Sequence, residues 1–232
     1  MCGRFTLTTS PDELQAAFDW LKMPPEMSDA HGGGPRYNIA PTQPVAVVPN
    51  DGFNRLDFFT WGLVPSWAKD PNIGSRMINA RAETLAEKPS FRNAFKRRRC
   101  LILADGFYEW QVIPGQKSKQ PMYITLEDHR PFAFGGLWEI WKSPDGSEIY
   151  SCTIITTEPN PLMATIHNRM PLILPPETYT QWLNPNEQRP EALKSLLEPY
   201  PASQMSAYPV SSLVNSPGND TPELVEPLRG AN

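Results

Sequence analysis

The sequence predicts an α+β fold with a mainly antiparallel β core, shaped as a barrel or a sandwich, and short peripheral helices. Short apolar or alternating runs bounded by turn residues dominate from about residue 45 onward. They do not alternate with helical patterns as parallel βαβ units do. The 27 prolines and 14 glycines are spread along the chain, which indicates many short elements joined by firm turns. Residues 1–232 fit a single domain.

The first predicted element is a helix that begins at Ser10. Ser10 is suited to the N-cap, Pro11 to the first helical position, and Glu13 completes a capping box. The apolar residues that follow share one helical face: Leu14, Phe18 and Leu21. Residues 24–36 are rich in proline, glycine and polar residues, so we expect a loop there.

The remaining elements are mostly strands. Apolar or alternating runs predict strands over 45–48, 56–61, 100–104, 107–111, 122–126, 132–138, 150–156 and 172–174. Helical patterns with suitable caps predict short helices over 90–96, 160–166, 176–182 and 190–197.

Composition limits the partners. No run reaches the roughly 18 to 20 apolar residues of a membrane span, and no apolar stretch of a secretory signal follows Arg4, so we expect a cytoplasmic protein without a membrane partner. The net charge of −4 counts mildly against nucleic acid. The basic run 96–99 nevertheless leaves open two alternatives, a local basic face or the solvated end of a helix.

The three cysteines, Cys2, Cys100 and Cys152, cannot all pair, and none lies in a CxxC arrangement. We therefore expect reduced thiols, no metal site and no cofactor. Cys100 and Cys152 lie in apolar runs, which favours buried positions on strands.

Cys2 has a different context, because Met1 is commonly removed when a small residue follows it. Removal would give Cys2 an α-amine with a pKa of about 7.7 to 8.0 beside a thiol near about 8.5. Such a 1,2-aminothiol can form an imine with an aldehyde and then close it with sulfur to a thiazolidine. The alternative is that Cys2 is an incidental second residue.

Glu109 is a candidate acid or base. It follows a predicted turn at Asp105 and Gly106, and by alternation it faces opposite to Tyr108 and Trp110. A carboxylate among aromatic side chains tends to have a raised pKa. The alternative is an ordinary glutamate on the exposed face of an edge strand.

Polar and aromatic residues elsewhere complete the set of candidates. His167 lies at a helix-to-strand junction and is the best candidate among the histidines, since His31 and His129 fall in predicted surface loops. Asn79 is a candidate orienting group, with Arg81 on the same strand face. Trp67 is suited either to stacking on a base or to the core.

Seven motifs in one order resemble the SOS-response-associated peptidase (SRAP) family over nearly the whole chain. They are MCGRF at 1–5, RYNIAPT at 36–42, WGLVPSW at 61–67, INARAET at 78–84, ADGFYEW at 104–110, IHNRMP at 166–171 and VNSPGND at 214–220. The resemblance implies an SRAP-like fold and a protein that binds abasic sites in single-stranded DNA in the DNA damage response.

The same resemblance implies roles for particular residues. The Cys2 amine and thiol would form a covalent thiazolidine crosslink with the sugar aldehyde and so shield the lesion. Glu109 and His167 would transfer protons, and Asn79 would position the Cys2 amine or the sugar.

The resemblance also implies how DNA would be held. Arg4 and Arg81 would grip flanking phosphates, and Pro41 and Trp67 would wedge and stack against bases. We expect a monomer that becomes nucleoid-associated when it binds DNA.

Two other functions remain open. In one, an N-terminal-nucleophile thiol peptidase or amidohydrolase, the Cys2 thiol attacks an amide; autopeptidase activity on Met1 is a related possibility that the family name implies. In the other, a non-catalytic DNA-binding module, Cys2 could become serine without loss of function.

Overall fold

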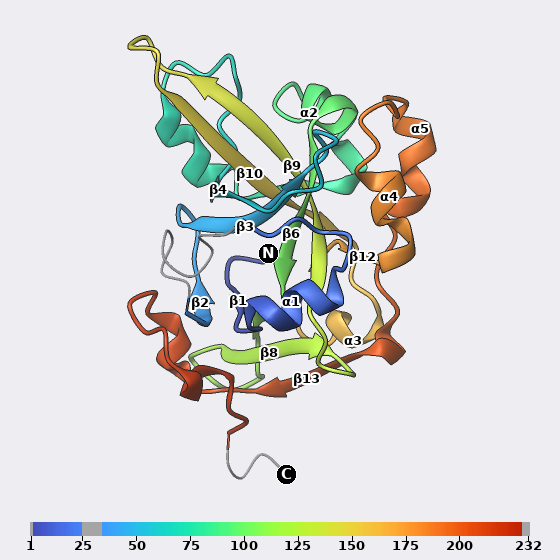
Figure 1. Ribbon diagram of the computed structural model, residues 1–232. Coiled ribbons are helices and arrows are strands. Elements are labelled where there is room, and N and C mark those ends of the chain that lie inside the picture. Colours follow the sequence, from blue (N-terminus) through green and yellow to red (C-terminus); the bar gives the residue numbers. More distant parts are fainter. Residues whose placement is uncertain (1, 25–33, 229–232) are drawn as a thin grey trace.

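The computed structural model describes residues 2–24 and 34–228, and Figure 1 shows their arrangement. The strands are β1 Phe5–Leu7, β2 Arg36–Ile39, β3 Pro44–Pro49, β4 Asp57–Trp61, β5 Asn79–Arg81, β6 Arg99–Ala104, β7 Gly106–Gln111, β8 Gln120–Leu126, β9 Phe132–Lys142, β10 Glu148–Thr157, β11 Met170–Pro171, β12 Ile173–Leu174 and β13 Met205–Pro209. The α-helices are α1 Pro11–Ala17, α2 Arg92–Arg97, α3 Pro161–Ala164, α4 Tyr179–Trp182 and α5 Pro190–Leu193.

The larger sheet closes on itself. Its order is β11-β10-β4-β3-β6-β9-β12, and β9 also pairs with β10, so β10, β4, β3, β6 and β9 form a ring. Most of its pairs are antiparallel, but β10 pairs in parallel with β4 and with β5. Closure removes the exposed edges that an open sheet would have. The predicted α+β class with a mainly antiparallel, barrel-like core is therefore confirmed.

The second sheet has the order β13-β8-β7-β1-β2 and is antiparallel throughout. In Figure 1, β8 and β13 lie side by side across the lower part of the molecule. The predicted turn at Asp105 and Gly106 is a corner between sheets, since β6 and β7 belong to different sheets. Asp105 secures this corner because its carboxylate accepts hydrogen bonds from Thr6, Thr8 and Thr9.

Gly106 is required at that corner by close packing. A Cβ atom there would lie 2.2 Å from the Tyr123 hydroxyl oxygen, which is too close for any side chain.

Strand β6 is buried on both faces, which explains its unbroken apolar run. Cys100 and Ile102 pack into one hydrophobic cluster together with Cys2, and Leu101 and Leu103 pack into the other. Cys100 and Cys152 are buried strand residues as predicted, and none of the three cysteines forms a disulfide.

The predicted elements are largely present. The helix at Ser10 has the predicted capping box, in which the Ser10 hydroxyl accepts from the Glu13 N–H and the Glu13 carboxylate accepts from the Ser10 N–H. The predicted helices 160–166 and 190–197 are shorter α-helices, the second of them continued by a 3-10 turn, Lys194–Leu196. Met1, His31 and most of the predicted loop lie outside the described residues. Among the helices of the described ranges, none has the length and apolarity to cross a membrane.

Strands β1, β2 and β13 were not predicted. Each is short, and β2 starts at Arg36 inside the segment expected to be a loop. Pairing with other strands fixes the extended conformation of these segments: β1 is held between β2 and β7, and β13 pairs with β8 over its whole length.

The basic run divides into exposed and structural arginines. Arg97 is exposed at the end of α2, as expected for a solvated helix end. Arg98 forms a 2.6 Å ion pair with Glu139. Arg99 is fully buried and donates hydrogen bonds to four backbone carbonyls, those of Trp182, Phe95, Lys96 and Asn184.

Candidate functional site

Cys2 lies buried at the start of the chain, just before β1. The Asn79 side-chain amide, at the start of β5, donates a 2.8 Å hydrogen bond to the Cys2 carbonyl oxygen. The Cys2 Sγ lies 3.9 Å from the Arg4 carbonyl oxygen. Burial raises the pKa of the Cys2 thiol, and the nearby negative charge of Glu109 raises it further. The thiol is therefore protonated at neutral pH.

Glu109 lies on β7 and is 2% exposed. Tyr108 and Trp110, its neighbours, pack into a separate cluster with Tyr123 and Val210, as the alternation along the strand predicts. Burial raises the pKa of the Glu109 carboxyl, and the charge of His167 acts in the opposite direction. Glu109 is thus a carboxyl group that holds its proton to a higher pH than an exposed glutamate.

His167 follows α3, whose N-cap Asn160 accepts a 2.8 Å hydrogen bond from the Met163 N–H. The His167 N–H donates back to the Met163 carbonyl oxygen. Its Nδ1 lies 3.1 Å from the backbone nitrogen of Arg169 and 3.2 Å from its carbonyl oxygen, so the Arg169 backbone orients the ring in either tautomer. Gln111 on β7 joins the two segments by donating to the Thr165 carbonyl oxygen at 2.8 Å.

The structure therefore brings Cys2, Asn79, Glu109 and His167 together from four distant segments. Asn79 contacts Cys2 directly, Glu109 interacts electrostatically with Cys2, and His167 interacts electrostatically with Glu109. A buried carboxyl beside an imidazole and a nucleophile is an arrangement suited to proton transfer. Sequence reasoning did not select Arg169, although it lies in the same motif as His167.

Arg169 connects this cluster to the surface near Arg81. It makes a two-pronged ion pair with Glu83, with distances of 2.6 and 3.0 Å, and donates to the Thr156 carbonyl oxygen at 2.6 Å. The hydrogen bonds from Arg169 to the Glu83 carboxylate lower the pKa of Glu83. Arg81 is exposed on β5 and pairs there with Thr156 on β10.

Arg4 points away from Cys2 toward the C-terminal part of the chain. Its guanidinium donates to the Asn38 side-chain oxygen at 2.8 Å and to the carbonyl oxygens of Val214 and Asn215 at 2.6 and 3.2 Å. These bonds use three of the five N–H donors of a guanidinium.

Pro41 and Trp67 lie in loops after β2 and β4. Trp67 is 59% exposed, which excludes the alternative of a core tryptophan. Pro41 is half-buried and precedes Thr42, whose φ of 72° is uncommon for a β-branched residue. The Thr42 N–H donates to the Trp61 carbonyl oxygen at 2.8 Å, which holds this strained turn in place. Backbone strain of this kind clusters at functional sites, a signal that the sequence alone did not give.

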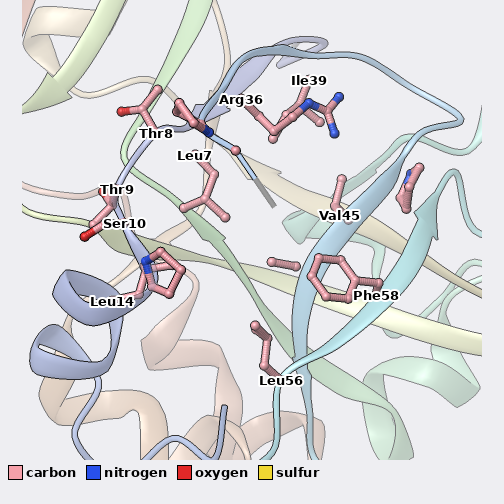
Figure 2. Close-up of a pocket in the computed structure, with 15 residues that line it drawn as sticks. Leu7, Thr8, Thr9, Ser10, Leu14, Arg36, Ile39, Val45, Leu56 and Phe58 are labelled. Carbon is pink, nitrogen blue, oxygen red and sulfur yellow. The ribbon is translucent and has the colours of Figure 1, made fainter. Parts of the chain in front are cut away.

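A separate cavity of about 410 Å³ lies between the β1–α1 connection and strands β2 to β4 (Figure 2). Its walls are mainly apolar and include Leu7, Leu14, Val45 and Phe58. None of the eight candidate residues lines it, so it is not part of the candidate site. Within the described ranges, no group of three or more His, Cys, Asp or Glu side chains is arranged to hold a metal ion.

Comparison with known proteins agrees with the motifs. The family model for SOS response associated peptidase (SRAP) matches residues 1–217. The chain belongs to the SRAP family. Among similar proteins, "Abasic site processing protein YoqW" of Bacillus subtilis is 53% identical over 227 residues, which cover 97% of this chain and 99% of that protein. "Abasic site processing protein HMCES" of Rattus norvegicus is 32% identical over 271 residues, covering 98% and 76%.

A solved structure confirms the fold. A crystal structure of a protein from Bacteroides thetaiotaomicron superposes with a TM-score of 0.87 at 27% identity, covering 98% of this chain and 100% of that one. This SRAP chain therefore shares its architecture with a protein of quite different sequence.

Proposed function

We propose that this SRAP protein processes abasic sites in DNA, and that Cys2, once exposed as the first residue, forms a covalent thiazolidine with the lesion. The observation that carries the proposal is the chain of contacts that starts at Cys2: Asn79 bonds to the Cys2 carbonyl, Glu109 interacts with Cys2, and His167 interacts with Glu109. The names of similar proteins, which describe abasic site processing, support the same substrate.

The chemistry balances without a cofactor. The Cys2 amine adds to the C1′ aldehyde of the ring-opened sugar, and loss of one water molecule leaves an imine. The Cys2 sulfur then adds to the imine carbon, and the thiol proton passes to the nitrogen, which closes the ring. Ring closure removes the imine that would otherwise promote β-elimination and strand cleavage.

The described contacts support a division of roles. Glu109, with its raised pKa, is suited to donate a proton to the departing hydroxyl group, and His167 is suited to exchange protons with Glu109. Asn79 holds the Cys2 carbonyl through its amide nitrogen, while its Oδ1 is buried without a hydrogen-bond partner in the described part of the chain. A buried acceptor of this kind is suited to orient the Cys2 amine or a sugar hydroxyl.

Surface features near Trp67 support single-stranded DNA as the partner. A pocket of about 560 Å³ adjoins Trp67 and is bordered by Lys69 and Arg76. An exposed indole beside cations suits base stacking with phosphate contacts. Arg81 and the remaining donors of Arg4 would contact flanking phosphates, and Pro41 would separate neighbouring bases.

The test uses purified protein whose N-terminus has been checked by mass spectrometry, mixed with single-stranded DNA that contains one abasic site. We expect a heat-stable adduct on a denaturing gel for the wild type and none for Cys2→Ala. Cys2→Ser is the matched control: like Cys2→Ala it retains the amine, but it also keeps a side-chain oxygen in place of sulfur, and it should form only an imine adduct, which requires borohydride to survive heating.

The competing function is a thiol peptidase or amidohydrolase, which the family description favours. If wild-type protein without Met1 gives no adduct, the crosslinking proposal fails. A thioester trapped at Cys2 from a peptide or amide substrate would then identify the hydrolase.

A further inference from the structure

The chain between residues 211 and 220, which we call the 211–220 segment, packs against β2, although the two are more than 170 residues apart in the sequence. Asp220 anchors one end of it. Its carboxylate accepts hydrogen bonds from the backbone N–H groups of Tyr37 and Asn38 and forms a 3.0 Å ion pair with Arg36. Three donors on one carboxylate fix the segment to β2.

Asn38 joins the 211–220 segment to the N-terminus. It is fully buried, at 0% exposure. Its Nδ2 donates to the carbonyl oxygens of Ser216 and Asn219 at 3.0 and 2.7 Å and lies 3.3 Å from that of Val214. Its Oδ1 accepts the hydrogen bond from Arg4. Both ends of the amide are therefore used, and no other side chain of this size presents the same donors and acceptor.

Arg4 completes the link because it also donates to Val214 and Asn215. The backbone carbonyl of Arg4 accepts from the Tyr108 N–H at 3.0 Å and lies 3.9 Å from the Cys2 Sγ. The side chain of Arg4 is thus held by the 211–220 segment, while its backbone contacts both Cys2 and the strand that carries Glu109.

The 211–220 segment also bonds directly to β7, the strand that carries Glu109. The Trp110 indole Nε1 donates to the Asn215 side-chain oxygen at 2.7 Å, and Trp110 directly follows Glu109 on β7. The 211–220 segment therefore bonds to Trp110, which directly follows Glu109, and to Arg4, two residues after Cys2, although it contacts neither candidate catalytic residue in these bonds.

We infer that the 211–220 segment, acting through Asn38 and Arg4, is a positioning element that holds Cys2 in register with Glu109. This inference rests on the proposed function, because it assigns the segment a role in the crosslinking step. Loss of the Asn38 amide would remove one of the three hydrogen bonds of the Arg4 side chain and the side-chain donor to the carbonyls of Ser216 and Asn219, so the segment would hold Arg4, and with it the short Cys2 end of the chain, less firmly. A misplacement of about 1 Å can lower a reaction rate roughly a hundredfold.

The key variant is Asn38→Ala, and Asn50→Ala is its matched control. Asn50 is likewise a buried asparagine, 3% exposed, and its side chain bonds to Arg97, Arg99 and Trp138, away from Cys2. Both variants lose several buried hydrogen bonds, so both should have lowered melting temperatures. Trp110→Phe provides a milder change, because it removes only the bond to Asn215.

Two measurements on folded protein separate positioning from stability. The first is the maximal crosslinking rate at saturating abasic DNA. We expect it to fall at least about tenfold in Asn38→Ala, to fall less in Trp110→Phe, and to stay within about twofold in Asn50→Ala. The second needs no DNA: iodoacetamide labelling of each thiol, followed by peptide mass spectrometry. Cys2 should react faster in Asn38→Ala, while Cys100 and Cys152 stay protected.

The outcomes are distinguishable. If wild-type protein forms no adduct, the proposed function fails, and the labelling pattern still decides whether the segment positions Cys2. Unchanged Cys2 labelling and an unchanged maximal rate in both Asn38→Ala and Trp110→Phe would overturn the inference. So would equal exposure of all three cysteines in Asn38→Ala, since that result would mean general loosening of the fold.

Discussion

The buried guanidinium of Arg99 allows a quantitative prediction about the basic run. In Arg99→Met, a side chain of similar length replaces one that donates to four carbonyl oxygens at 2.7 to 3.1 Å. Burial lowers the pKa of Arg99 only to about 10, so the group is charged at neutral pH and its hydrogen bonds are charge-assisted. Removing it leaves buried carbonyls without donors, which is the costly way to break a hydrogen bond.

The size of the effect follows from these contacts. Each bond from a charged donor contributes about 1.5 to 3 kcal/mol, but members of one network are not additive. Each buried carbonyl left without a donor costs about 1 to 3 kcal/mol, and since the four costs do not add in full, we expect a loss of about 4 kcal/mol. For a chain of this size, about 2 to 4 °C per kcal/mol converts this to a melting temperature lower by about 8 to 16 °C.

The assay is thermal unfolding, with Arg97→Met as the control. Arg97 lies two residues earlier and is exposed, so its replacement should change the melting temperature by less than about 2 °C. If the melting temperatures of the two variants lie within about 2 °C of each other, the four hydrogen bonds of Arg99 do not stabilise the fold as described. A large loss of DNA affinity in folded Arg99→Met, without one in Arg97→Met, would also refute the assignment of Arg99 to the interior.

Two further predictions concern the site. Because burial raises the pKa of Glu109, the native state binds this proton more tightly than the unfolded chain, and Glu109 lowers stability increasingly as the pH rises above its ordinary value of 4.5. Between pH 4.5 and 8, the melting temperature of Glu109→Gln should therefore fall less steeply than that of the wild type. The crosslinking rate of the variant should also drop. If the melting temperatures of the two proteins fall in parallel with pH, the result would contradict a raised pKa of Glu109. Trp67→Ala should weaken binding to single-stranded DNA by about 1 to 3 kcal/mol in a fluorescence titration, whereas Phe53→Ala, which removes a side chain that is 60% exposed, should not; equal losses would count against stacking on Trp67.

Much of the fold follows from local patterns because those patterns are strong. The apolar run of β6 and the capping box at Ser10 each specify an element by themselves. Strand β1 has only three residues and β2 includes Arg36, so neither carries a period that could be recognised. Their conformation is decided by pairing with distant strands, which is a tertiary effect.

The corner at Asp105 shows a second limit of sequence reasoning. The Asp-Gly pair between two apolar runs predicts the turn, but it does not show that the two strands belong to different sheets. The threonine side chains and backbone after β1 occupy the Asp105 carboxylate, so the chain passes from one sheet to the other instead of folding back. No sequence pattern near Asp105 indicates that its carboxylate binds Thr8 and Thr9, which lie 97 and 96 residues earlier in the chain.

Motifs predicted the residues of the candidate site, whereas each residue taken alone also had an ordinary structural explanation. The geometry of the site shows why. Glu109 in isolation is an ordinary strand glutamate, and only the burial seen in the fold raises its pKa. Asn38 lies in the RYNIAPT motif, but nothing in that motif indicates its role, because its side chain binds carbonyl groups contributed by residues 214–219. Backbone acceptors have no sequence signature, so a residue that binds them is found only in a structure.

The state of the Cys2 thiol bears on the choice between the two functions. A thiol peptidase attacks with a thiolate, and such enzymes lower the pKa of the nucleophile with nearby positive charge. Around Cys2, burial raises the pKa most and Glu109 raises it further, and these effects exceed the lowering by the positive N-terminus and the Arg4 carbonyl contact. Thiazolidine formation begins with the amine and uses the sulfur second, when the thiol proton is needed on the ring nitrogen. The raised pKa of the Cys2 thiol, which burial causes first, therefore suits the proposed crosslinking reaction better than thiolate attack on an amide.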